Sequence, residues 1–390
     1  MNPDALRAAA EARYPAFIAR LAELVAVDSG SRQVAGLHQV ATLLSGYAEN
    51  AGLSVRRHPV TGPDGEPLGD AVVARMRGTG TRRILLAAHL DTVFPAGTAQ
   101  ARPFTVDTTT GRAHGPGVSD DKGGLLAGLA AVEVLAATGS LSCGELILIA
   151  TPDEEIGSIG SRELLTGLAT GADAVLCLEC ARDNGDLVTA RKGVADIEID
   201  LIGRAAHAGI EPERGANAAL AAAHLTVALQ QLNGSAPDLT VNVGVLRAGT
   251  RPNVVAERAH LVVDLRAADP AVFDAALAEI STLARLPVVT GVAGSMRIVA
   301  PAPPWSGGAG TDRLLLAAER VGAALGLTVT HAATGGCADA NLLAANGAPV
   351  LDGLGPVGGG DHGPDEWLDL SSVVPRVALL AGLIEVVAAS

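Results

Sequence analysis

The spacing of apolar residues predicts alternating helices and strands in the first half of the chain. Residues 5–26 and 36–51 repeat apolar positions at helical spacing, and Gly52 is a stop signal after the second segment. Residues 83–89 and 146–150 are almost continuously apolar, which is typical of parallel strands covered on both faces. The further elements predicted here are a helix over 124–137, a helix near 159–168 and a strand over 174–179.

The pattern changes after Lys192. Residues 197–201 alternate apolar and charged side chains, which predicts a strand with one face in water. The elements predicted to follow are a helix over 216–232, strands near 239–247 and 259–267, a helix over 271–286 and a strand near 288–299. This β-α-β-β-α-β order is the ferredoxin-like arrangement.

Proline-rich residues 300–304 predict a linker back to the first pattern. The elements predicted beyond it are a helix over 311–325, a strand near 327–331, a helix near 338–346, a strand over 348–352 and a helix from about 371. We therefore predict an α/β fold, with a mixed, mostly parallel sheet that carries helices on both faces, and an inserted ferredoxin-like α+β domain. The predicted larger domain comprises residues 1–192 and 303–390, and the inserted domain comprises residues 193–302.

Composition and charge argue against several classes of partner. The formal net charge of −14 opposes binding to nucleic acid or to an anionic membrane, because both require clustered Lys and Arg. The first segment carries Asp4, Glu11 and Glu23, so it lacks the uninterrupted apolar stretch of a signal peptide. No run approaches the ~18 apolar residues that span a bilayer. We expect a cytoplasmic protein without a nucleic-acid or membrane partner.

The four cysteines are too few for a disulfide scaffold in a chain of this length. Cys177 and Cys180 have the spacing of a redox or zinc motif, but they fall within a predicted strand and no second pair completes a zinc site. We interpret all four as buried, inert thiols.

Candidate chemistry gathers where predicted strands end. Residues 89–93, 119–124 and 153–155 each follow an apolar run that predicts a buried strand, and Glu179 and His362 occur in the same setting. The carboxyl ends of neighbouring strands are the usual location of a site in an open α/β sheet. Two histidines and three carboxylates can hold a pair of divalent metals, so a hydrolase is the leading interpretation.

Each candidate also has a structural explanation. A lone His89 at a strand end is more often structural, but Asp91 points to the same side of an extended chain and could hold the imidazole. Asp120 and Asp121 could simply cap a helix, although a nearby cation would relieve the repulsion between adjacent carboxylates.

Glu154 and Glu155 follow a buried strand, where charge is expensive without a partner. One glutamate could bind a metal ion while its neighbour acts as general base toward the metal-bound water. The alternative is a solvated acidic loop.

Three motifs resemble the signatures of the M20 family of metal-dependent peptidases and deacylases, especially its glutamate carboxypeptidase branch. They are His89-Leu-Asp-Thr-Val93, Gly115-Pro-Gly-Val-Ser-Asp-Asp-Lys-Gly-Gly124 and Thr151-Pro-Asp-Glu-Glu-Ile-Gly157. The resemblance covers nearly the whole chain. It implies a zinc exopeptidase-like catalytic domain, and an inserted lid that also joins two subunits into a homodimer.

The resemblance also implies roles for single residues. The ligands of two zinc ions would be His89, Asp120, Glu155, Glu179 and His362, with Asp120 bridging. Asp91 would orient His89, Glu154 would be the general base, and the peptide bond between Asp120 and Asp121 is often cis in the family. Cobalt or manganese could replace zinc.

In the lid, residues 203–209 resemble a family motif whose histidine, here His207, reaches a neighbouring subunit's site and polarises the scissile carbonyl. Asn253 and Arg266 match positions that bind substrate, including its free carboxylate. A turn asparagine and a strand-end arginine are the structural alternatives. Cys337 replaces a small hydroxyl residue common in relatives, so strict glutamate specificity is not implied.

The predicted reaction is hydrolysis of the amide bond in N-acyl amino acids or at the C-terminal residue of small peptides. The runner-up is a deacylase of the acetylornithine deacetylase or succinyl-diaminopimelate desuccinylase type. A non-catalytic binding protein would be expected to lack Glu154 or a ligand, and none is lost. A phosphate- or nucleotide-binding α/β protein could use residues 358–360, but no Walker lysine or strand-led GxGxxG accompanies them.

Overall fold

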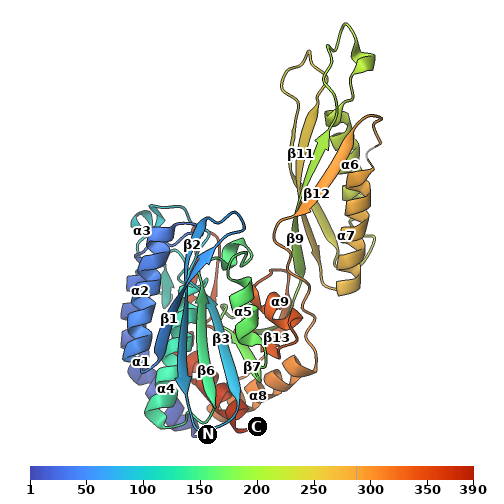
Figure 1. Ribbon diagram of the computed structural model, residues 1–390. Coiled ribbons are helices and arrows are strands. Elements are labelled where there is room, and N and C mark those ends of the chain that lie inside the picture. The colour runs from blue at the N-terminus through green and yellow to red at the C-terminus, as the bar shows by residue number, and fades with distance from the viewer. Residues whose placement is uncertain (287) are drawn as a thin grey trace. The chain divides into compact units, whose positions relative to one another are not determined.

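The computed structural model describes residues 1–286 and 288–390, which form two compact units (Figure 1). Unit 1 consists of Met1–Ala190, Gly307–Ala333 and Ala338–Ser390, and unit 2 consists of Arg191–Ser306 and Thr334–Cys337. The main boundaries lie close to those expected from the sequence. The short segment Thr334–Cys337 is an addition to unit 2 that the sequence pattern does not indicate.

A six-stranded sheet in the order β1-β2-β6-β3-β7-β14 forms the centre of unit 1. Its strands are β1 Ser54–Thr61, β2 Pro67–Arg77, β3 Arg83–His89, β6 Glu145–Thr151, β7 Ala174–Cys177 and β14 Val350–Leu351. Strands β6, β3, β7 and β14 are parallel, and β2 is antiparallel to both of its neighbours. The prediction of a mixed, mostly parallel sheet is therefore confirmed. Ile84, Leu85 and Leu86 are all buried, because helices cover both faces of β3.

Helices lie on both faces of this sheet (Figure 1). They are α1 Pro3–Val25, α2 Val34–Asn50, α4 Lys122–Thr138, α5 Arg162–Ala169, α8 Ala309–Leu325, α9 Asp339–Ala345 and α10 Leu370–Ala389, with the short α3 at Thr98–Ala101. Helix α4 packs against β3 and β6 and contacts α1 and α10, whereas α9 packs against β7 and β14 and contacts α5. Buried apolar residues of α1, α2, α4, α8 and α10 and of strands β2, β3, β6, β7 and β14 form one core cluster.

Helix α10 is long and apolar enough to cross a membrane, with a mean hydropathy of 1.8 over its most apolar window. The sequence-based expectation that no run approaches this length is therefore wrong. Within the fold, 61% of that window is buried, and residues such as Leu380 and Leu383 belong to the core. Core packing accounts for its composition.

Two small sheets lie wholly or mostly in unit 1. The strands β15 Gly358–Gly359, β16 Trp367–Asp369, β5 Arg112–His114 and β4 Thr105–Asp107 form one sheet in that order. The other pairs β8 Leu187–Arg191 with β13 His331–Thr334, so the strand expected near 327–331 begins later than predicted. The first of these sheets joins the segment before α4 to the segment before α10, because Trp367 pairs with His114.

Unit 2 has the predicted β-α-β-β-α-β order. Its elements are β9 Gly193–Ile202, α6 Ala218–Gln230, β10 Thr240–Ala248, β11 Arg258–Ala267, α7 Pro270–Arg285 and β12 Ala293–Ile298. The sheet order is β10-β11-β9-β12 and every pairing is antiparallel. Alternate residues Ile197, Ile199 and Leu201 are buried in the core that α6 and α7 share with the sheet. The alternating pattern of β9 follows from this one-sided burial.

Candidate metal centre

Three predicted site segments follow parallel strands of the main sheet. His89 is the last residue of β3 and lies opposite Thr151 of β6 in the register. Glu154 and Glu155 begin a short 3-10 helix, η1 Glu154–Ile156, just beyond β6, and Glu179 lies just beyond β7. Because these strands are parallel and adjacent, their carboxyl ends deliver the four side chains to one edge of the sheet.

Asp120 belongs to the same cluster, but it lies on a loop that does not follow a strand of the main sheet. The sequence-based prediction that a buried strand precedes residues 119–124 is wrong, because the preceding strand β5 is short and belongs to the small antiparallel sheet. Asp120 lies in the loop that leads into α4, and its peptide bond to Asp121 is cis, as the family resemblance implied. Asp121 is the N-cap residue of α4, but its side chain makes no capping hydrogen bond. Helix capping therefore does not explain the Asp120–Asp121 pair.

His362 completes the cluster from the loop between β15 and β16. Its Nε2 atom lies 3.2 Å from Asp120 Oδ2 and 3.1 Å from Glu155 Oε2. On the other side, His89 Nε2 lies 2.9 Å from Asp120 Oδ1 and 3.9 Å from Glu179 Oε1. Each carboxylate oxygen of Asp120 thus faces a different imidazole. The structure brings all five predicted metal ligands together.

The described residues contain two overlapping groups whose ligand atoms lie within 4.8 Å of one another and could hold a metal ion. One group is His89, Glu154 and Glu179, and the other is His89, Asp120 and Glu155. In proteins, zinc and related divalent ions are bound by imidazole nitrogens and carboxylate oxygens, the kinds of atom that these two groups supply.

The ionisable groups of the cluster shift one another's pKa values. Hydrogen bonds to Asp120 and Glu155 raise the pKa of His362 to about 10. Burial alone would raise the pKa of Asp120, but hydrogen bonds from His362 and His89 outweigh it and lower that pKa. Burial raises the pKa of Glu155 and raises that of Glu154 well above its ordinary value. Without a metal, protonated imidazoles balance the negative charge of the carboxylates. A bound divalent cation would supply that positive charge instead, so the imidazoles would release protons.

Asp91 does more than the sequence indicates. His89 Nδ1 is 3.0 Å from the Asp91 backbone oxygen and 3.4 Å from its Oδ1 atom. The Asp91 carboxylate also accepts hydrogen bonds from the amides of Glu154 and Glu155, at 3.1 and 3.2 Å, and from the Ser31 hydroxyl at 2.7 Å. Asp91 therefore connects the His89 imidazole to the turn that carries both glutamates. Nothing in the sequence pattern identifies Ser31 as a partner.

Two buried acids near η1 were not assigned a role from the sequence. Asp153 accepts hydrogen bonds from the amides of Gly160 and Ser161, at 2.7 and 3.2 Å, which fixes the chain beyond η1. Asp339, at the start of α9, accepts hydrogen bonds from Ser158 Oγ at 2.5 Å and from Thr151 Oγ1 at 3.3 Å. Burial raises the pKa of Asp339 to about 6.

The three remaining predicted residues belong to unit 2. His207 and Asn253 are neighbours there, because the Ala208 amide donates a hydrogen bond to the Asn253 carbonyl at 3.1 Å. His207 comes shortly after Ile202 and Asn253 shortly before Arg258, and these two residues pair at one end of the sheet.

Arg266 lies near the other end of β11 and is already paired. Its guanidinium donates hydrogen bonds to both carboxylate oxygens of Asp264, at 3.0 to 3.1 Å, and to the Gly335 carbonyl at 3.3 Å. The stretch of β11 from Arg258 to Arg266 spans roughly 26 Å. Within unit 2, the structure thus does not bring Asn253 and Arg266 together. The Asp264 partner could have been predicted, because residues two apart on a strand share a face.

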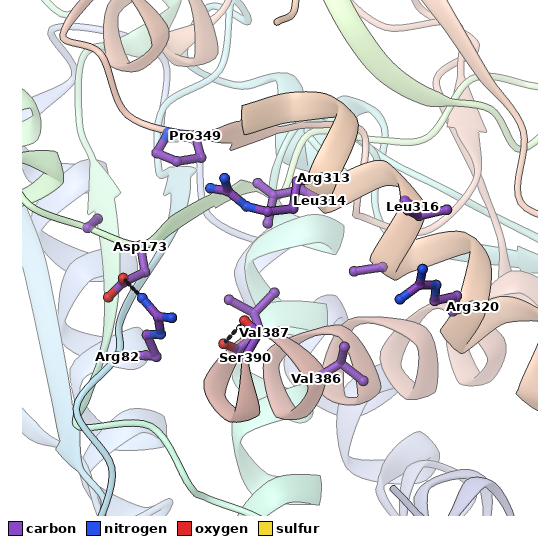
Figure 2. Close-up of a pocket in the computed structure, with 12 residues that line it drawn as sticks. Arg82, Asp173, Arg313, Leu314, Leu316, Arg320, Pro349, Val386, Val387 and Ser390 are labelled. Carbon is purple, nitrogen blue, oxygen red and sulfur yellow. Dashed lines mark hydrogen bonds and ion pairs between the residues drawn. The ribbon is translucent and has the colours of Figure 1, made fainter. Parts of the chain in front are cut away.

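A separate cavity of about 530 Å³ lies at the opposite edge of the main sheet. Figure 2 shows its lining, in which Arg82 pairs with Asp173 at 2.6 Å and α8 supplies Arg313 and Arg320. Arg82, Asp173 and Pro349 directly precede β3, β7 and β14, so the cavity lies at the amino ends of strands whose carboxyl ends carry the acidic cluster. No member of that cluster lines it.

Comparisons with known proteins identify the family of the chain. Residues 85–386 match the peptidase family M20/M25/M40. The chain is 31% identical over 382 residues to carboxypeptidase G2 from a Pseudomonas species, covering 96% of this chain and 90% of the relative. It is 27% identical over 391 residues to an acetylornithine deacetylase from Proteus mirabilis, covering 96% of this chain and 97% of the relative.

The fold is similar to that of a solved tripeptidase from Staphylococcus aureus, with a TM-score of 0.79 and 22% sequence identity over 97% of this chain and 99% of that one. These similarities confirm the predicted fold class and the resemblance that the three sequence motifs carry.

Proposed function

Because the chain belongs to the peptidase family M20/M25/M40, we propose that it is a di-zinc amidohydrolase that acts on N-acyl amino acids or on the C-terminal residue of small peptides. The family shows that the chain is a hydrolase acting on amide bonds, and the described residues include a candidate metal-binding cluster. The identity and number of the ions and the class of substrate are our proposal.

The observation that carries the proposal is the position of Asp120 between two imidazoles. One zinc ion would be held by His89, Asp120 and Glu179, and the other by His362, Asp120 and Glu155. The cluster fits this role because its members already approach one another within 2.9 to 3.9 Å. When bound, the ions would lower the pKa of water to about 7 and polarise the substrate carbonyl.

Glu154 is our proposed general base. A carboxylate oxygen of Glu154 lies within 4.8 Å of potential metal-binding atoms of His89 and Glu179. Its backbone amide donates a hydrogen bond to the Asp91 carboxylate. Burial raises the pKa of Glu154, so its carboxylate accepts a proton more readily. Glu154 would take a proton from the attacking water and pass it to the leaving amine.

Substrate recognition would use residues from two subunits. Arg266 lies near one end of β11, Asn253 lies before the other end, and the strand from Arg258 to Arg266 spans roughly 26 Å, so one small substrate could not contact both within a single lid. We therefore assign Arg266 and the His207–Asn253 pair to the lids of different subunits at each site. Asp264 already pairs with Nε and Nη2 of Arg266, so the free carboxylate of the substrate would be bound by the remaining N–H groups of Nη1 and Nη2.

Exposed apolar residues of the lid support the homodimer. Leu220 and Val227 are 48% and 59% exposed and lie on one face of α6, since they are two turns apart. Leu246 is 46% exposed on β10, which is an edge strand of the sheet. An exposed edge strand beside an apolar helix face is suited to pairing with a second copy.

The test is hydrolysis of a panel of N-acyl amino acids and dipeptides by zinc-loaded protein, with acetylornithine and N-succinyl-diaminopimelate included for the deacylase alternative. That alternative is favoured by the acetylornithine deacetylases among the relatives. Glu154→Gln should abolish turnover, whereas Glu163→Gln, at an exposed position on α5, should not. Full activity in Glu154→Gln would refute the proposed base, and unchanged turnover after thorough chelation would refute the metal mechanism.

A further inference from the structure

Glu366 is a buried acid outside the proposed ligand set. It lies on the same loop as His362, just before β16, and is only 1% exposed. Its carboxylate accepts hydrogen bonds from three backbone amides of the loop that carries Asp120. The donors are Gly117 at 2.9 Å, Ser119 at 2.8 Å and Asp120 at 3.1 Å.

This arrangement determines the path of the chain through Asp120. The loop leaves β5 and must turn into α4 within a few residues, so regular structure offers its amides few partners. Two amides share Glu366 Oε1 and the third binds Oε2, so both carboxylate oxygens are engaged. The Glu366 backbone oxygen also lies 3.1 Å from His114 Nδ1, which secures the same contact from β5.

We propose that Glu366 is a positioning residue that places Asp120 for metal binding. This inference rests on the proposed function, because it assumes that Asp120 bridges two zinc ions. Glu366 acts through the backbone of residues 117–120. Because its carboxylate binds the Asp120 loop and its own backbone belongs to the His362 loop, it links the two proposed ligands that do not follow strands of the main sheet.

The test compares Glu366→Gln with the wild-type protein. Glutamine keeps the shape of the side chain, but its NH₂ group donates rather than accepts, so at least one of the three amides would face another donor. Asp173→Asn is the matched control. Asp173 also accepts a backbone amide, from Arg83 at 2.8 Å, but it lies at the amino end of β7, away from the acidic cluster.

Zinc affinity is measured by competition with a chromophoric chelator, on protein whose folding is checked by circular dichroism. We expect Glu366→Gln to bind zinc about 10-fold or more weakly and to lose kcat with little change in KM. Asp173→Asn should melt at a lower temperature yet bind zinc like the wild-type protein. Folded Glu366→Gln with wild-type zinc affinity would overturn the inference, whereas a wild-type protein that binds no zinc would overturn the proposed function itself.

A second measurement needs no variant. The amides of Gly117, Ser119 and Asp120 should exchange slowly with deuterium in the wild-type protein, because each is bound to a buried acceptor. Exchange at the rate of exposed loops would contradict the role of Glu366, even if Glu366→Gln failed to fold.

Discussion

Replacing Asp91 with asparagine tests how the proposed base and ligands are held. Asp91 is 1% exposed, and its carboxylate accepts hydrogen bonds from Ser31, Glu154 and Glu155. The variant Asp91→Asn keeps the backbone oxygen that lies 3.0 Å from His89 Nδ1. Its main effect should therefore fall on the Glu154–Glu155 turn, because the NH₂ group of asparagine must face one of the three donors.

The size of the effect follows from these contacts. A hydrogen bond to a charged group contributes about 1.5–3 kcal/mol, and a buried donor left without an acceptor costs about 1–3 kcal/mol. Asp91→Asn replaces a charged acceptor by a neutral one and removes at least one bond, so we expect the free energy of unfolding to fall by about 2–4 kcal/mol. Because the turn also carries the proposed base, we expect kcat to fall by about 10–100-fold.

Denaturant unfolding of the metal-free protein measures the first quantity, and steady-state hydrolysis by the zinc-loaded protein measures the second. Asp200→Asn is the control. Asp200 is an exposed residue of β9 that pairs with His260 at the surface, so its loss should change the free energy of unfolding by about 0.5 kcal/mol or less. An Asp91→Asn protein with wild-type stability and wild-type kcat would refute this account of the Glu154–Glu155 turn.

Three further predictions concern the metal, the dimer and the substrate. Removal of metal by a chelator should lower the melting temperature, because the clustered carboxylates then repel one another without a cation between them. Added zinc should restore the melting temperature. A melting temperature that the chelator does not change would contradict the metal site. Substituting Glu for both Leu220 and Val227 should yield monomers in sedimentation velocity and reduce kcat, since His207 would no longer reach a second site. The control Leu316→Glu, on α8, should leave the dimer intact. A double variant that remains dimeric would exclude α6 from the interface. Arg266→Ala should raise KM by about 10-fold for substrates with a free carboxylate but not for their methyl esters, because a charge-assisted hydrogen bond is lost only with the carboxylate. An equal rise in KM for both kinds of substrate would show that Arg266 does not bind the carboxylate.

The site can be predicted from the sequence where it depends on buried parallel strands. The continuous apolar run of β3 predicts that strand, and His89 follows as its last residue. The same reasoning predicts Glu154 and Glu155 beyond β6 and Glu179 beyond β7. The acidic residues lie near one another because adjacent parallel strands end at one edge of the sheet.

The rest depends on contacts that a local pattern does not contain. Strand β1 carries two arginines, a histidine and a proline, and only Val60 of its residues is buried, so no periodicity marks it. Strands β15, β16 and β5 are two or three residues long, too short for a periodic signal. Glu366 finds its three amide partners almost 250 residues earlier in the chain, through the pairing of these short strands.

The most direct test of the central claim is anomalous diffraction at the zinc edge from crystals of the zinc-loaded protein. We predict two peaks per chain, about 3.5–4 Å apart, on either side of the Asp120 carboxylate. One should lie against His89 and Glu179, and the other against His362 and Glu155. A single peak, or peaks away from these side chains, would contradict the proposed di-zinc site.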